Sequence, residues 1–300
     1  MAESDNELRF DYAQAFSRNI GWVTEQEQQV LRHRCAAIAG AGGVGGVHLL
    51  TLARMGVGAF NLADFDTFDV PNFNRQAGAF VSTLGQPKVE VMARMARDIN
   101  PEVKIRVFPQ GVNQGNLREF LQDADVYVDG LDFFAFEARR QTYAMCEEMG
   151  VPATCAAPLG MGVAALNFVP GGMSFEDYFG WGNLPELEMA IRFLVGLAPA
   201  GLHRSYLVPG GINLAERRGA STAMACQLCS GVAATQAIKM MLKRGNIRAA
   251  PHGFQYDAYR DKYVHTWRPG GNRHPLQWLA IQLARRKINA LLAQQGGGKI

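Results

Sequence analysis

The feature that most constrains this chain is a glycine-rich turn, GAGGVGG, at residues 40–46. The short apolar run CAAIA precedes it, and a helical pattern over 44–54 follows before a second run, AFNLADFD. Strand, glycine turn, helix and strand in this order indicate a βαβ unit. Gly40, Gly42 and Gly45 have the spacing GxGxxG, which allows a tight turn, close approach of a phosphate to the backbone and close packing of helix on strand.

An acid follows at the place where a nucleotide site needs one. Asp64 lies 24 residues after Gly40, at the end of the second strand, where a carboxylate can accept hydrogen bonds from ribose hydroxyls. The turn therefore predicts a nucleotide site, and the alternative is a turn required only for packing. The motif alone does not distinguish NAD from ATP.

The same alternation of strands and helices continues to residue 160. Pro87 occupies an expected first helical position, and the helix should end before Asn100 and Pro101. Further strands are expected at 104–108, 125–130 and 152–158, with a helix between the last two that ends near Gly150. This order predicts an α/β fold with a Rossmann-like, doubly wound, mostly parallel sheet and helices on both faces.

After Gly160 the pattern changes, and we expect antiparallel strands, a crossover region and helices. A strand is expected at 163–170, a helix at 184–196, a long helix at 221–243 and a late strand at 261–267. The last helix, 275–293, places Leu276, Leu279, Ala280 and Leu283 on one face. The predicted organisation is an N-terminal helical arm (1–34), a nucleotide-binding core (35–160) and a C-terminal part (161–300) that completes the same domain, with a crossover or lid at 171–220.

Composition narrows the class of protein. The 300 residues are 48% hydrophobic and 19% charged, which is typical of a folded globule with a large core. The net charge of +3 is small, so nucleic acid is not the expected partner. The uncharged stretches are interrupted by glycine, proline or polar residues and do not predict a membrane span. An acidic, polar N-terminus and five cysteines, an odd number, favour a cytoplasmic protein without a disulfide framework.

The segment after Asp64 favours ATP over NAD. It brings together Asn72, Arg75, Gln76 and Lys88, which a dehydrogenase does not require. Lys88 falls in the first turn of a helix, where the helix dipole disfavours a cation, so an anion is expected nearby. Arg75 and Lys88 are therefore candidates to bind the phosphates of ATP, and the alternative is a solvated surface patch.

Several short motifs in one order resemble the MoeB/ThiF/HesA family of ATP-dependent adenylyltransferases, relatives of the ubiquitin-activating enzymes. The resemblance is close over residues 16–160 and looser over 219–243. Its motifs are SRNIG (17–21), GAGGVGG (40–46), LADFD (62–66), NFNRQ (72–76), GQPK (85–88), NP (100–101) and DVYVDGLD (125–132).

The resemblance implies a Mg²⁺- and ATP-dependent enzyme that adenylates a carboxylate, such as the C-terminus of a ubiquitin-like or sulfur-carrier protein, a peptide or a small molecule. It also implies a homodimer, because Arg18 matches an arginine that reaches the site of the other subunit. The implied roles are nucleotide binding by Gly40, Gly42, Gly43, Gly45, Asp64, Asp66 and Gln76, phosphate binding by Asn72, Arg75 and Lys88, and magnesium binding by Asp132.

The sequence departs from the family in three places. Only one CxxC pair, Cys226 and Cys229, is present, so the structural zinc of many members is not expected. Residues 171–221 contain no cysteine, so we expect adenylation without a loop-cysteine thioester, with Cys226 and Cys229 as weaker candidates. Phe133 and Phe134 follow Asp132, where the family commonly has Asn.

Other features leave alternatives open. Four aromatic residues of the insert form either a substrate pocket, a dimer contact or a local core: Phe175, Tyr178, Phe179 and Trp181. The basic run 285–287 is expected to be a solvated helix face, and the alternative is contact with a membrane or an acidic partner. The tail GGGKI is expected to be a flexible end.

Two other functions compete with adenylation. An NAD(P)-binding oxidoreductase explains the glycine turn and Asp64 but not Arg75, Lys88 and Asp132 together. A catalytically inactive nucleotide-binding partner subunit is the third possibility, and the presence of all the charged positions argues against it.

Overall fold

The computed structural model describes residues 9–208, 212–213 and 218–296. Eight strands form one sheet in the order β10-β9-β6-β5-β4-β1-β2-β3. Neighbouring strands from β3 to β5 are parallel, whereas β6, β9 and β10 are added antiparallel. The predicted fold class, a mostly parallel sheet continued by antiparallel C-terminal strands, is confirmed.

The strands of this sheet are β1 (Cys35–Ala39), β2 (Ala59–Ala63), β3 (Lys104–Phe108), β4 (Val126–Asp129), β5 (Ala153–Leu159), β6 (Gly162–Phe168), β9 (His252–Asp257) and β10 (Lys262–Trp267), and a separate two-stranded pair joins β7 (Ile212–Asn213) to β8 (Arg218–Gly219). The helices are α1 (Tyr12–Ala15), α2 (Glu25–Arg32), α3 (Gly45–Arg54), α4 (Lys88–Ile99), α5 (Leu117–Leu121), α6 (Phe136–Met149), α7 (Phe175–Phe179), α8 (Glu186–Leu197), α9 (Ala223–Leu242) and α10 (Pro275–Gly296), and the single 3₁₀ turns include η1 (Ser17–Asn19) and η4 (Leu202–Ser205).

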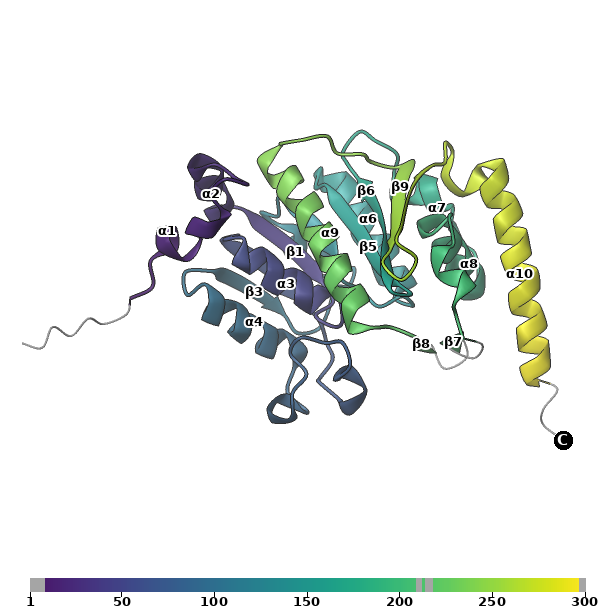
Figure 1. The fold of residues 1–300 in the computed structure, drawn as a ribbon, viewed down its shortest axis with the longest axis horizontal. Coiled ribbons are helices and arrows are strands. Elements are labelled where there is room, and N and C mark those ends of the chain that lie inside the picture. The colour runs from purple at the N-terminus through teal and green to yellow at the C-terminus, as the bar shows by residue number, and fades with distance from the viewer. Residues whose placement is uncertain (1–8, 209–211, 214–217, 297–300) are drawn as a thin grey trace, which may run out of the picture.

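Helices cover both faces of the sheet, as expected for a doubly wound fold (Figure 1). Side chains of α3, α4 and α9 share one hydrophobic core with one face of the strands. Side chains of α5, α6, α7 and α8 share a second core with the opposite face. The all-buried strand β1 contributes alternate residues to both cores, which explains why its sequence is apolar throughout.

The insert after residue 170 belongs largely to the second core. Phe175, Tyr178, Phe179 and Trp181 are all buried and contact one another edge-on or tilted, so the local-core interpretation holds. Because α7 contacts α6, and α8 contacts both α6 and β6, these two helices help to cover the second face of the sheet.

Two details of the sequence prediction were wrong. The strand β9 was not predicted. Pro87 is the N-cap of α4 rather than its first helical residue, so the helix begins at Lys88. On α10, Leu276, Leu279 and Leu283 of the predicted apolar face are at least half exposed, whereas Ala280 packs with Ile281 in a cluster that α10 shares with α8. The tail beyond residue 296 lies outside the described residues. No helix among the described residues is long and apolar enough to cross a membrane.

The second core provides a test of the fold. Trp181 has no exposed surface and packs against Phe136 and Phe175 at ring-centroid distances of 5.6 and 5.0 Å. Replacing Trp181 by Ala should lower the free energy of unfolding by about 3–5 kcal/mol, measured by urea denaturation. Trp278→Ala is the matched control, because Trp278 is 58% exposed and its loss should change stability by less than about 0.5 kcal/mol. Equal effects of the two substitutions would contradict this placement of the insert.

Candidate functional site

The glycine turn lies where the sheet order reverses, between the carboxyl ends of β1 and β4. Gly40 has φ +88°, and a Cβ atom there would lie 2.1 Å from the carbonyl oxygen of Gly130, which follows β4. A Cβ atom at Gly45 would lie 1.7 Å from the carbonyl oxygen of Gly40. No other residue fits at either position. Open α/β sheets bind ligands at this switch point.

The helix that follows begins without a side-chain cap. Val44 is the N-cap of α3, and its side chain makes no capping hydrogen bond. The backbone N–H groups of Gly42, Gly43 and Val44 have no protein acceptor among the described residues. Unpaired amides at the positive end of a ten-residue helix form an anion-binding site, so the turn fits the phosphates of a nucleotide.

Asp64 stabilises the glycine turn through two hydrogen bonds. Its Oδ2 accepts a hydrogen bond of 2.6 Å from the amide of Ala41, and its Oδ1 accepts one of 2.8 Å from the amide of Asp66. Burial raises the pKa of Asp64, although these two amides and Lys88 oppose the rise. The carboxylate lies at the end of β2, as predicted, and each oxygen retains a lone pair for a ribose hydroxyl.

Lys88 is nearly buried and already forms an ion pair with a carboxylate. Its side chain is 7% exposed, and Nζ lies 2.9 Å from Oδ2 of Asp66, whose side chain is 51% exposed. The backbone amide of Lys88 also donates to the carbonyl of Asp66. The anion expected from the position of Lys88 is therefore, in this structure, a carboxylate of the same chain.

Arg75 and Gln76 lie over the glycine turn. The Cγ and Cδ atoms of Arg75 lie 3.5 Å from the position of a Cβ atom on Gly43, and the amide nitrogen of Gln76 lies 3.6 Å from that on Gly42. Gln76 is buried, and its Oε1 has no hydrogen-bond partner. A buried, unpartnered oxygen beside the turn is available to a ligand donor.

The other predicted polar residue of this segment has a structural partner. The side-chain oxygen of Asn72 accepts a 3.0 Å hydrogen bond from the amide of Asp69, and its carbonyl accepts the amides of Arg75 and Gln76. Asn72 therefore shapes the loop that carries Arg75, and its side-chain amide nitrogen remains for a ligand.

Asp132 lies on the turn after β4. It is exposed, and its Oδ1 accepts a 3.0 Å hydrogen bond from the amide of Phe134. Sequence reasoning missed the buried ion pair below this turn, between Asp129 and Arg139, which are 2.8 Å apart. An acid at the end of a buried strand was the available signal for it.

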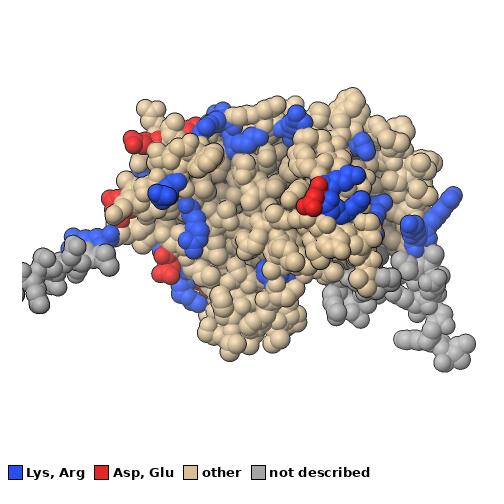
Figure 2. Space-filling model, viewed as in Figure 1, with Lys and Arg blue, Asp and Glu red and all other residues tan. Residues whose placement is uncertain are grey.

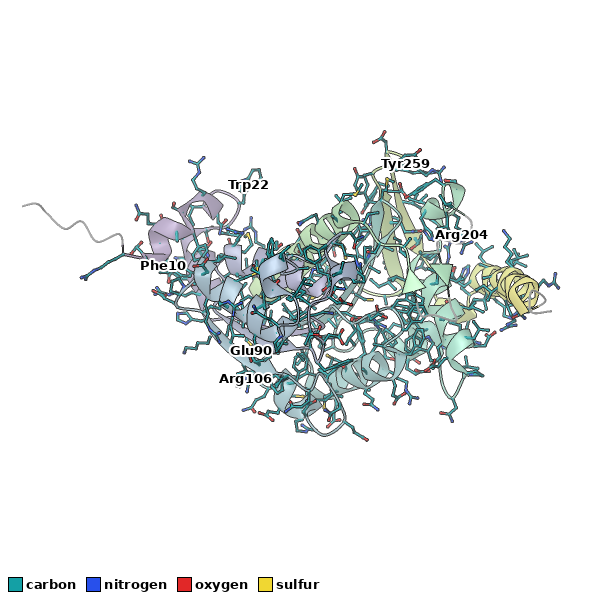
Figure 3. The ribbon with its side chains drawn as sticks, turned by 90° about the horizontal axis from the view of Figure 1, so that it is seen from below. Phe10, Trp22, Glu90, Arg106, Arg204 and Tyr259 are labelled. Atoms are coloured by element: carbon teal, nitrogen blue, oxygen red, sulfur yellow. The ribbon has the colours of Figure 1, made fainter. Side chains whose placement is uncertain are left out.

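Arg18 is not brought to this site within one chain. It lies on η1, in an arm that contacts the far end of α3: the Tyr12 hydroxyl donates to the carbonyl of Gly56 at 2.7 Å, and Asn19 donates to that of Arg54. The glycine turn is at the opposite end of that helix, about 15 Å away along its axis. Figure 3 shows this arm, marked by Phe10 and Trp22, at one end of the molecule, and Tyr259 and Arg204 toward the other.

The cysteine pair lies on α9. Cys226 is buried, with its sulfur 3.4 Å from the position of a Cβ atom on Gly43, and Cys229 is fully buried. Burial raises the pKa of both thiols. The reactive thiolate is therefore disfavoured in this state.

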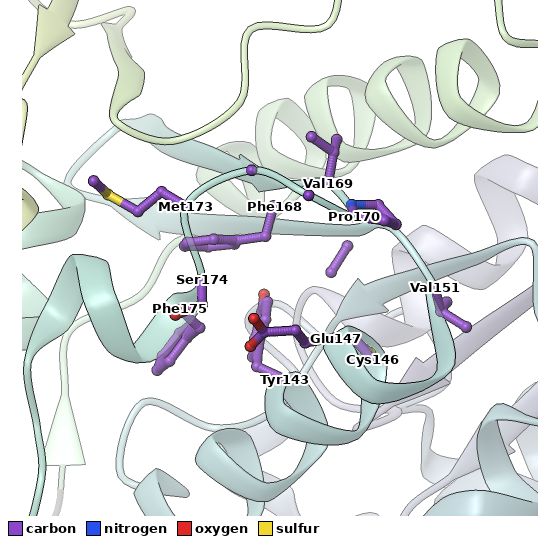
Figure 4. Close-up of a pocket in the computed structure, with 13 residues that line it drawn as sticks. Tyr143, Cys146, Glu147, Val151, Phe168, Val169, Pro170, Met173, Ser174 and Phe175 are labelled. Carbon is purple, nitrogen blue, oxygen red and sulfur yellow. The ribbon is translucent and has the colours of Figure 1, made fainter.

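Two other observations limit where ligands bind. A small hollow between α6, the end of β6 and the start of α7 is lined by residues that include Tyr143, Glu147 and Phe175 (Figure 4). It opens near the start of β5, at the opposite end of the parallel strands from the glycine turn. Among the described residues, no cluster of three or more His, Cys, Asp or Glu side chains could hold a metal ion.

Fold and site together define a Rossmann-like α/β protein whose glycine turn has free amides and is covered by an arginine and a glutamine. Residues 16–279 match the ThiF family, and the chain belongs to it.

This chain matches its known relatives over only part of their length. The tRNA threonylcarbamoyladenosine dehydratase of Bacillus subtilis (strain 168) is 35% identical over 123 residues, which are 41% of this chain and 48% of that protein. The molybdopterin-synthase adenylyltransferase of Haemophilus influenzae is 30% identical over 152 residues, 50% of this chain and 62% of that protein. The chain thus spans about half the length of these relatives.

A solved structure has the same fold. The crystal structure of Escherichia coli MccB with ATP matches with a TM-score of 0.63 and 19% identity, over 87% of this chain and 72% of that one.

The helix that presents the free amides also carries a buried histidine. His48 has no exposed surface, and neither ring nitrogen has a hydrogen-bond partner. Burial lowers the pKa of His48 from 6.5 to about 4, against a smaller opposing effect of Asp129.

This histidine predicts a pH-dependent stability. Between pH 6.5 and about 4 the unfolded chain binds a proton at His48 and the folded chain does not. The free energy of unfolding should therefore decrease as the pH is lowered from 6.5 to about 4, by up to about 3 kcal/mol. Urea denaturation at pH 7.0 and 4.5 should show a smaller difference for His48→Leu than for wild type. His33→Leu, at an exposed position, should keep the wild-type difference, and an unchanged difference in His48→Leu would refute the assignment.

Proposed function

We propose that this protein is an adenylyltransferase that uses ATP and Mg²⁺ to adenylate a carboxylate and releases pyrophosphate. The acceptor carboxylate belongs to a small ubiquitin-like or sulfur-carrier protein, a peptide or a small molecule. The observation that carries the proposal is a glycine turn with free amides over which the Cγ and Cδ atoms of Arg75 pack. The guanidinium of Arg75 bonds the carbonyl of Pro71 and Oδ1 of Asn74 in this structure, and we propose that it turns to the phosphates when the nucleotide binds. An NAD site needs the turn and Asp64 but does not explain Arg75, Lys88 and Asp132 together.

The chemistry suits these residue types. A carboxylate oxygen attacks the α-phosphorus, and the bond from that phosphorus to the oxygen bridging to the β-phosphate breaks. The nucleophile is already ionised and needs no general base. It must approach a polyanion, so stabilising the negative charge is the main requirement. Arg75 can bind phosphate oxygens in a bidentate manner, and Lys88 acts as a point charge.

Asp132 fits a magnesium ion that is held mainly by the nucleotide. Mg²⁺ is commonly bound by one or two carboxylates together with substrate phosphates, which needs no protein cage. Oδ1 of Asp132 accepts the hydrogen bond from the Phe134 amide, and Oδ2 has no hydrogen-bond partner within the described part of the chain. The ion supplies charge neutralisation at the phosphates when bound.

The relatives support this class of reaction. One is named as an adenylyltransferase of molybdopterin synthase, and MccB has been solved both with ATP and with MccA. We carry over activation of a carboxylate and assign adenylation without a loop-cysteine thioester, since residues 171–221 lack cysteine. The buried thiols of Cys226 and Cys229 support the same assignment.

Lys88→Ala and Asp132→Asn test the proposal. Both should reduce pyrophosphate exchange, measured with a panel of carboxylates that includes the C-terminal peptides of candidate carriers, by about 100-fold or more, because each removes charge stabilisation at the phosphates. Thermal shift with ATP and Mg²⁺ should stabilise the wild type and stabilise Lys88→Ala less. Lys104→Ala, an exposed lysine on β3, is the control. Stabilisation by NAD⁺ alone, unaffected by Lys88→Ala, would replace adenylation by a redox function.

We further propose that the active form is a homodimer, in which Arg18 reaches the partner's site. Two observations support it. Arg18 lies too far from the glycine turn to act in its own chain. The lobe formed by residues 65–86, beside the site, exposes six large apolar side chains: Phe65, Val70, Phe73, Phe80, Val81 and Leu84. The tip of this lobe shows no charged side chain in the view of Figure 2.

Mixing two inactive variants tests the shared site. Arg18→Ala and Lys88→Ala should each be inactive alone. In a re-equilibrated mixture, half of the dimers combine one chain of each kind and contain one complete site, so pyrophosphate exchange should return to about a quarter of the wild-type rate at equal total protein. A mixture as inactive as its components would exclude sharing of Arg18 between chains.

A further inference from the structure

A buried ion pair lies directly under the turn that carries Asp132. Asp129 ends β4 and Arg139 lies on α6, and both side chains are 3% exposed. Nε of Arg139 donates to Oδ2 of Asp129 at 2.8 Å. Neither residue is placed to touch a nucleotide, so the reaction proposed above makes no direct use of them.

The rest of the guanidinium is directed at the turn itself. Nη2 of Arg139 donates to the carbonyls of Leu131 and Asp132 at 2.8 and 3.0 Å, and Nη1 donates to the carbonyl of Phe133 at 3.3 Å. Three consecutive carbonyl groups are thus held by one planar group. The ring of Phe193, on α8, lies 4.7 Å from the guanidinium carbon and limits its movement.

The carboxylate of the pair is also anchored on all sides. Oδ1 of Asp129 accepts the amide of Leu131 at 3.1 Å, and the hydroxyls of Tyr127 and Tyr143 approach its oxygens at 3.4 Å. The turn is therefore bonded to the pair through both its amide and its carbonyl groups. This satisfies a buried charge pair that would otherwise be costly.

We propose that Arg139 is a positioning residue that fixes the Asp132 carboxylate for the metal–nucleotide complex. The inference rests on the metal role proposed for Asp132. The guanidinium fixes the backbone on both sides of Asp132, and the hydrogen bond from the Phe134 amide then orients its side chain. An exposed carboxylate on an unrestrained turn would lose conformational entropy when it binds the metal, which weakens binding. Here the turn is already ordered in the folded protein, so that entropy is lost during folding instead.

The alternative is that the pair only stabilises the fold. Buried ion pairs often contribute little net stability, and replacing both partners by apolar residues of similar size is frequently neutral. The double variant Asp129→Leu/Arg139→Met therefore distinguishes stabilisation of the fold from positioning of Asp132. It keeps the side-chain volume but loses the hydrogen bonds to the turn.

The test measures metal affinity apart from turnover. Binding of Mn²⁺ is followed by electron paramagnetic resonance in the presence of α,β-methylene-ATP, and binding of the analogue is measured separately in EDTA. Arg139→Lys keeps the charge but loses the planar fork, and it should weaken Mn²⁺ binding about 10- to 100-fold while analogue affinity in EDTA stays within about twofold. Arg140→Lys is the matched control, since Arg140 is the next residue on α6 and pairs with Glu137 at the surface.

The double variant should fold with cooperative urea denaturation and show the same loss of Mn²⁺ affinity. Wild-type Mn²⁺ affinity in both Arg139→Lys and the double variant would overturn this inference and leave the proposed function intact. A wild-type protein that binds Mn²⁺ no better with the analogue than without it would instead overturn the metal role of Asp132, and the inference with it.

Discussion

The backbone contact between the glycine turn and Gly130 determines where every part of the site lies. Gly40, Gly45 and Gly130 approach one another without side chains, at the one place where the connections from β1 and β4 run to opposite faces of the sheet. This contact brings the first turn of α3 against the strand ends, so its amides face outward. It also places the turn carrying Asp132 beside those amides. A single methyl group at Gly40 or Gly45 would separate two segments that, under the proposed function, act on one ligand.

The parallel half of the fold could be predicted because its signals are local. Runs such as 35–39 and 126–129 are short, apolar and bounded by turn residues, and each becomes a fully buried strand. The C-terminal half depends on distant partners. HGFQYD in β9 has little strand signal and is held by β6 on one side and β10 on the other. Which side of α10 is buried depends on its contact with α8, which begins almost ninety residues earlier in the chain.

The site shows the same division. Asp64 follows the second strand as its position predicts, and Arg75 and Gln76 lie over the turn because their loop returns to it. The partner of Lys88 could not be predicted, because it depends on a side-chain conformation at Asp66 rather than on spacing. The pairing of Asp129 with Arg139 needs the path of the chain between β4 and α6. The location of Arg18 relative to a site cannot follow from one chain, since its own arm is bound to the opposite end of α3.

The pair formed by Lys88 and Asp66 has a consequence for the strength of ligand binding. A phosphate that reaches Lys88 must displace a carboxylate already 2.9 Å from the ammonium group, so part of the attraction is cancelled by the contact that is lost. The half-exposed carboxylate can turn toward solvent and return when the phosphate departs. Under the proposed function, this pair keeps a nearly buried cation from being left without a compensating charge when no phosphate is bound, and it makes phosphate binding weaker than a free lysine would. Rapid exchange of nucleotide is the expected behaviour of such a site.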